Sequence, residues 1–163
     1  MKYTCTLIAV KNMENAKQFY HDVLGLEVIS DFGANVTLTG GLALQTLDSW
    51  KDFIHKSDDE MIFGNNVSEL YFEEEDMDTF ITKLSDIKDI EYVHTLFEHS
   101  WGQRVVRFYD RDKHIIEVGE KMNMVIKRFI DSGLSIEEAA ARMDVPVSYL
   151  SFVQILNLEN VTY

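Results

Sequence analysis

The chain has 163 residues, the usual size of one domain, and its composition, 46% hydrophobic and 26% charged, is ordinary for a globular protein. Its one cysteine excludes an intramolecular disulfide, and no apolar run is long enough for a signal peptide or a membrane span, so we expect a cytoplasmic protein with no membrane partner. The net charge of -13 would repel a nucleic acid, and aspartates interrupt the densest basic group, at 104–113, so we do not expect nucleic-acid binding.

One pattern of residues occurs twice. Met13 aligns with Met77 and Val23 with Ile87, and each copy predicts a strand, an amphipathic helix and three shorter strands. The first copy predicts a strand at 3–10, a helix capped by Asn12, and strands at 26–31, 35–38 and 42–47. A linker at 48–66 contains apolar residues that predict a short helix. The second copy predicts a strand at 67–74, a helix capped by Asp76, and strands at 90–96, 104–109 and 114–118.

The duplication predicts an α+β fold with two βαβββ modules, because one curved sheet with one helix cannot cover both of its faces. Two modules together can enclose a cavity. We expect a domain at 1–120, made of modules 1–48 and 67–120, and a helical C-terminal extension at 121–163. In the extension, Gly133 is a predicted C-cap, and Ser135 with Glu138 forms a predicted capping box.

Three segments resemble the vicinal oxygen chelate superfamily, which includes glyoxalase I, bleomycin-resistance proteins and extradiol dioxygenases. They are 7–14, then 19–28 with its Phe-Tyr-x-x-x-Leu-Gly signature, and the aspartate-rich hairpin at 105–118. The resemblance covers about residues 1–120 and implies the paired-module fold. It is weak for activity, because one fold hosts many functions.

The resemblance also implies where metal-using relatives place their ligands. These positions fall on Cys5, Gln45, Glu69 and Glu117, and only Glu117 matches the common set, which includes histidines. A ring-cleaving dioxygenase needs two histidines and a carboxylate, so that activity is not expected. A zinc, nickel, manganese or iron site with Glu69 and Glu117 as catalytic carboxylates is one of the alternatives left open.

The same resemblance puts Glu69 and Glu117 in one cavity, where two carboxylates cannot both ionise without compensation. A metal, a shared proton, or an arginine such as Arg104 or Arg107 would supply it. The alternative is a wet cavity in which both carboxylates are solvated.

A second cluster lies on the loop between two strands of the second copy. His99, Trp101 and Arg104 are candidate ligand-binding residues there, since aromatic rings and an arginine can grip a planar or polar molecule. The alternative is a packed surface loop that Trp101 anchors.

Residues 134–150 resemble the core of a bacterial helix-turn-helix, but the predicted recognition helix, 147–156, carries no Lys or Arg. We therefore consider three hypotheses for the function: binding of a small molecule in the cavity, a metal-dependent glyoxalase-like lyase or isomerase, and a transcription-associated regulator. Members of this superfamily commonly dimerise, so we expect a homodimer.

Overall fold

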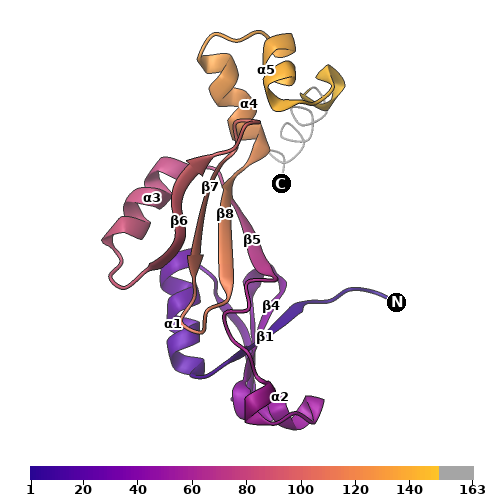
Figure 1. Cartoon of the computed structure of the whole chain (residues 1–163), viewed down its shortest axis with the longest axis vertical. Coiled ribbons are helices and arrows are strands. Elements are labelled where there is room, and N and C mark those ends of the chain that lie inside the picture. The colour runs from indigo at the N-terminus through magenta and orange to yellow at the C-terminus, as the bar shows by residue number, and fades with distance from the viewer. Residues whose placement is uncertain (151–163) are drawn as a thin grey trace. The chain divides into compact units, whose positions relative to one another are not determined.

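The computed structural model describes residues 1–150, and this part of the chain forms two compact units. The first unit comprises residues 1–69 with the short segments 89–91 and 109–115. The second comprises 70–88, 92–108 and the chain from 116 onward. Each unit contains one four-stranded sheet with a helix, which confirms the predicted α+β fold with two βαβββ modules (Figure 1).

The first sheet has the strand order β1-β4-β3-β2. Its strands are β1 (Thr6–Val10), β2 (Val28–Asp31), β3 (Asn35–Leu38) and β4 (Leu42–Thr46). β1 pairs parallel with β4, whereas β3 is antiparallel to both of its neighbours. β1 begins at Thr6, not at the predicted residue 3, because Thr6 lies opposite Leu42, where β4 itself begins after a glycine turn. A strand without a partner has no ladder of hydrogen bonds.

Helix α1 (Met13–Leu24) covers this sheet with Ala16, Phe19, Tyr20 and Val23 buried. Its N-terminus is capped as predicted, since the side chain of Asn12 accepts a hydrogen bond of 2.9 Å from the backbone N–H of Asn15. A second helix, α2 (Leu47–Ile54), follows β4 directly, so the helix predicted in the linker exists but starts one residue earlier than the linker does.

The turn between β7 (Arg104–Tyr109) and β8 (Ile115–Glu120) belongs to the first unit and is held there by Asp110. This buried carboxylate accepts hydrogen bonds of 2.8 Å from the hydroxyl of Tyr20 and from the backbone N–H of His114, and it pairs with the ring Nδ1 of His114 at 2.8 Å. Burial by itself would raise the pKa of Asp110, but its bonds to His114 and Tyr20 outweigh burial and lower that pKa. The aspartate-rich hairpin is therefore bound to α1 through Asp110 and Tyr20.

The second sheet has the order β5-β8-β7-β6. Its strands are β5 (Glu69–Glu74), β6 (Glu91–Glu98), β7 (Arg104–Tyr109) and β8 (Ile115–Glu120), and helix α3 (Met77–Asp86) lies along one of its faces (Figure 1). Asp76 caps α3 as predicted, accepting from the backbone N–H of Thr79 at 3.1 Å. The core between helix and sheet is apolar and contains Met77, Phe80, Leu84, Val106, Phe108, Ile116 and Val118.

Two helices follow β8, α4 (Met122–Asp131) and α5 (Ile136–Met143), and a further helical stretch begins at residue 147. The C-cap of α4 is Ser132, and Gly133, the predicted C-cap, follows it with a φ of 98°. The predicted capping box of Ser135 and Glu138 starts α5. One apolar cluster joins these helices and comprises Val125, Ile126, Phe129, Ala139, Ala140, Met143 and Leu150. The predicted recognition helix lies mostly outside the described residues, and none of the described helices has the length and apolar character of a membrane span.

Candidate functional site

The two faces of the second sheet carry different polar side chains. Arg104 of β7 pairs with Asp78 of α3 at 2.7 Å, so Arg104 lies on the face that α3 covers. Side chains alternate along a strand, so Arg107, three residues further on, points to the opposite face. Glu117 of β8 pairs with Arg107 and shares this face. The face away from α3, here called the open face, is the candidate site.

Glu117, Arg107 and His94 form a polar network on the open face. The side chain of Glu117 is 7% exposed and forms an ion pair with the guanidinium of Arg107, which is itself 24% exposed. The other guanidinium nitrogen, Nη1, lies 3.2 Å from Nε2 of His94. Arginine can only donate, so Nε2 accepts this bond and the proton of the ring is on Nδ1, which donates to the carbonyl of Thr95 at 2.8 Å. Arg107 thus neutralises the buried carboxylate and orients the histidine.

Aromatic side chains form a wall beside this network. The rings of His99 and Trp101 are stacked, with centroids 4.1 Å apart and an angle of 7° between their planes. Phe97 meets the edge of His99 at a centroid distance of 5.2 Å. Trp101, which is 38% exposed, and Phe97, which is 53% exposed, both keep ring surface that a ligand can cover.

Hydrogen bonds fix the loop that carries this wall. Nε1 of Trp101 donates to the side-chain oxygen of Gln103 at 3.4 Å, and Nε2 of Gln103 donates to the hydroxyl of Tyr71 at 3.1 Å and to the carbonyl of Glu120 at 3.0 Å. Tyr71 lies against Gly119, where a Cβ atom would be only 3.1 Å from the hydroxyl oxygen of Tyr71. The glycine therefore lets the tyrosine lie flat on β8, within reach of Gln103.

The electrostatics of the wall favour a neutral His99. Burial lowers the pKa of His99 below its usual value of 6.5, and the electrostatic influence of the neighbouring Arg107 and His94 lowers it further. At neutral pH the stack of His99 on Trp101 is then a stack of two uncharged rings. Such a surface suits a planar partner that brings its own charge.

The four positions suggested for a metal do not present a free set of ligands. The buried amide of Gln45 accepts from Asn35 at 2.8 Å and donates to Ser49 at 2.5 Å, and Glu117 is already neutralised by Arg107. Cys5 is half-buried and lies in the first unit, and Glu69 is an exposed residue at the start of β5. Among residues 1–150, no group of three or more His, Cys, Asp or Glu side chains is placed to hold a metal ion. Two of the four suggested ligands, Gln45 and Glu117, are thus engaged by other side chains, and the four-residue metal set stays a prediction.

Of the three predicted ligand-binding residues, the structure brings two together. His99 and Trp101 are stacked, whereas the guanidinium of Arg104 is held on the other face by Glu120 at 2.9 Å and by Asp78. The residue that the sequence did not single out is Tyr71, whose bond with Gln103 joins β5 to the loop. The charge of the buried Glu117 carboxylate is compensated by the guanidinium of Arg107, one of the groups that the sequence suggested.

The class of the protein follows from comparison with known families. The sequence model of the glyoxalase-like domain matches residues 3–123, and the chain belongs to this family. No curated protein matches the chain.

Solved structures agree with this assignment. A protein of unknown function from Agrobacterium tumefaciens is 36% identical, with a TM-score of 0.67 over 74% of this chain and 94% of that one. Two more distant structures show the fold alone. A lactoylglutathione lyase from Agrobacterium tumefaciens is 22% identical, with a TM-score of 0.55 over 74% of this chain and 94% of that one. A glyoxalase/bleomycin resistance protein/dioxygenase from Nocardioides is 17% identical, with a TM-score of 0.61 over 74% and 83%.

Proposed function

We propose that the protein binds a small planar cation on the open face of the second sheet, without a metal. The stack of His99 and Trp101 carries this proposal, since it offers partly exposed, uncharged π-surface at neutral pH. A cation gains from such rings, and a protein with a net charge of -13 attracts cations to its surface. The ion pair of Glu117 and Arg107 supplies polar contacts beside the wall.

A pair of probes of equal shape tests the proposal. N-methylquinolinium is a planar cation, and quinoline is its neutral counterpart at pH 7.5. In a Trp50→Phe protein, Trp101 is the one remaining tryptophan, so its fluorescence reports binding at the wall. We expect both probes to quench Trp101 and the cation to bind about fivefold more tightly, which corresponds to about 1 kcal/mol of cation–π interaction. Absence of quenching by both probes at millimolar concentration would refute binding at this wall.

The second candidate is a metal-dependent lyase or isomerase that uses Glu69 and Glu117. It is favoured by the family and by the match of Glu117 to a ligand position, and it requires a metal to displace Arg107 from Glu117. Elemental mass spectrometry of protein purified without chelator tests it, together with Glu69→Ala and Glu117→Ala. Near-stoichiometric metal that disappears in both variants would make the enzyme the leading function.

A regulator that binds DNA through the C-terminal helices has less support. Every Lys and Arg of the extension is engaged in an ion pair: Lys121 with Glu75, Lys127 with Asp131, Arg128 with Glu98 and Glu120, and Arg142 with Glu98. Phosphate groups would have to compete with these carboxylates.

We also propose a cytoplasmic homodimer. Two edge strands expose apolar side chains that a partner could cover, including Val28 and Ile29 of β2 and Tyr92, Val93 and Leu96 of β6. Sedimentation velocity at micromolar concentration distinguishes a dimer from a monomer.

A further inference from the structure

The loop at 99–103, here called the site loop, has a second role besides carrying the aromatic wall. It is also the surface on which α4 packs. Gly102 has a φ of 92°, and a Cβ atom on it would lie 2.1 Å from Cζ of Phe129. The ring of Phe129 therefore rests directly on the backbone of the site loop, and no residue other than glycine fits at this point.

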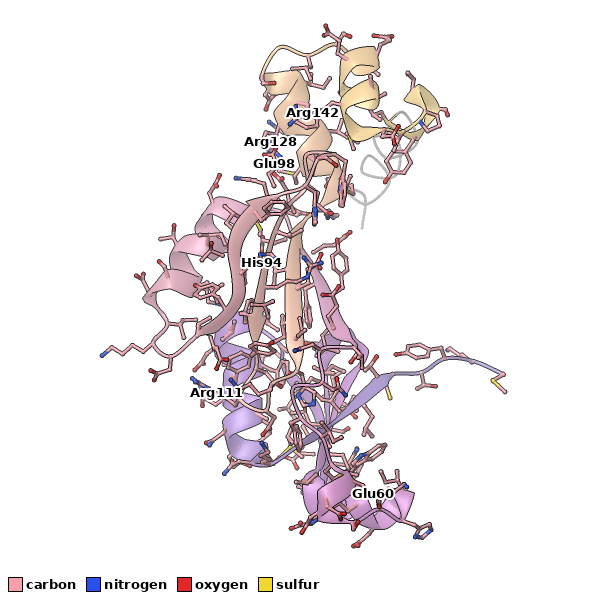
Figure 2. The ribbon with its side chains drawn as sticks, viewed as in Figure 1. Glu60, His94, Glu98, Arg111, Arg128 and Arg142 are labelled. Carbon is pink, nitrogen blue, oxygen red and sulfur yellow. The ribbon has the colours of Figure 1, made fainter. Side chains whose placement is uncertain are left out.

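Arg128 of α4 ties the site loop to the ends of two strands. Its Nη2 donates to the carbonyl of Gly102 and to Glu120 at 3.0 Å, and its Nη1 donates to Glu98 at 3.3 Å. Arg142 of α5 reaches the other oxygen of Glu98 at 3.4 Å. Figure 2 shows Glu98, Arg128 and Arg142 gathered where α4 and α5 meet the end of β6.

Glu120 of β8 connects α4 and the site loop to the sheet. Its side chain is 2% exposed and accepts bonds from both Arg104 and Arg128, while its backbone carbonyl accepts from Gln103 of the site loop. Burial would raise the pKa of Glu120, but the bonds from the two arginines outweigh it and lower that pKa, so the carboxylate stays charged at neutral pH. A movement of α4 must therefore disturb the site loop.

We propose that Arg128 is a positioning residue for the ligand site: α4 and α5 hold the site loop so that His99 stacks on Trp101, and a ligand on that stack in turn tightens the docking of the two helices. The first half of this proposal, that α4 and α5 hold the site loop, needs only the observed contacts. The second half rests on the proposed function and follows from it, since the coupling between two sites is reciprocal.

The first experiment needs no ligand. In the Trp50→Phe background, protonation of His99 quenches the stacked Trp101, so fluorescence from pH 4.5 to 8.5 gives the midpoint of His99 titration. Burial lowers the pKa of His99 most, and the neighbouring Arg107 and His94 add to this effect. Arg128→Gln should free the site loop, move the midpoint up toward about 6.5 and reduce the amplitude. Lys127→Gln is the matched control, because Lys127 lies on the same helix but pairs, within residues 1–150, with Asp131 alone.

An unchanged midpoint and amplitude in Arg128→Gln would overturn the proposal, as would an equal change in Lys127→Gln. Far-UV circular dichroism checks that the variants fold. If Arg128→Gln does not fold, Arg142→Gln, which removes the outer contact with Glu98 and a cation–π contact with Phe129, should shift the midpoint in the same direction by less. Arg128→Lys keeps the charge but not the forked geometry, so it should restore the midpoint only in part.

The second experiment uses N-methylquinolinium. Arg128→Gln should bind it about fivefold more weakly, as expected when one aromatic wall is misplaced. Saturating probe should slow amide hydrogen exchange across 122–131 in the Trp50→Phe protein. Equal affinity in both proteins, or unchanged exchange with the probe bound, would overturn the second half. If the probe does not bind at all, the proposed function and this half fail together, while the titration of His99 still decides the role of Arg128.

Discussion

Replacement of Arg107 by methionine tests the electrostatics of the open face. The change keeps most of the side-chain volume but leaves the carboxylate of Glu117, which is 7% exposed, without its partner. Removing one member of a buried ion pair costs about 3–5 kcal/mol. Because Arg107 is 24% exposed, water reaches the pair, and we expect Arg107→Met to lose about 2–3 kcal/mol of unfolding free energy.

We expect this loss at both pH 5 and pH 8, because the substitution removes the partner of the Glu117 carboxyl at either pH.

Urea unfolding at both pH values, followed by far-UV circular dichroism, measures this loss. Replacing both residues by methionine should recover at least about 1.5 kcal/mol of the loss, because two apolar groups of similar shape can pack where the pair stood. A change of less than about 0.5 kcal/mol in Arg107→Met at both pH values, or no recovery in the double variant, would show that the pair is not a buried charge interaction.

Three further predictions concern other parts of the chain. Asp110→Asn should lose about 1–3 kcal/mol of unfolding free energy at pH 7, since the buried carboxylate of Asp110 accepts hydrogen bonds from the hydroxyl of Tyr20 and from the backbone N–H groups of Asp112 and His114. The pKa of Asp110 is lowered in the folded state, so its carboxylate stabilises the fold at pH values above the unfolded pKa of about 3.9. This stabilisation is lost as the pH falls through the folded pKa. On acidification, the free energy of unfolding should therefore fall less in Asp110→Asn than in the parent protein. Gly102→Ala should be destabilised by at least about 1 kcal/mol more than Gly133→Ala in thermal unfolding, because both glycines have positive φ but only Gly102 lies against Phe129. A gel shift with random duplex DNA at low salt should show no tight, salt-sensitive complex; such a complex would revive the regulator hypothesis.

Local features of the fold followed directly from the sequence. Asn12, Asp76 and the Ser135 capping box start helices as predicted, because a cap needs only a side-chain oxygen a few residues from the N–H it accepts. The strands at Asn35–Leu38 and Arg104–Tyr109 have the predicted bounds. The other strands begin or end up to three residues away from their predicted bounds. Pairing with a neighbouring strand sets these bounds, as the start of β1 at Thr6, opposite the start of β4 at Leu42, illustrates.

The candidate site was predictable only in part. The sequence indicated that Glu69 and Glu117 in one cavity would need compensation by a metal, a shared proton or an arginine, and it left Arg104 and Arg107 open. Their positions on β7 differ by an odd number, so they must point to opposite faces, but only the packing of α3 on one face decided which arginine meets Glu117. The metal positions came from a family resemblance, which carries no information on whether Asn35 and Ser49 already occupy the amide of Gln45.

The sequence by itself determined the duplicated modules, the helix caps, the apolar faces and the aromatic content of the site loop, because each of these depends on residues close together in the chain. The tertiary structure alone decided the pairing of Arg107 with Glu117 and His94, the reach of Gln103 to Tyr71, and the contact of Phe129 with Gly102. These contacts join segments up to 32 residues apart, as for Tyr71 and Gln103, and depend on strand order and on the packing of helices against the sheet. Neither strand order nor helix packing is encoded in the local pattern of polar and apolar residues.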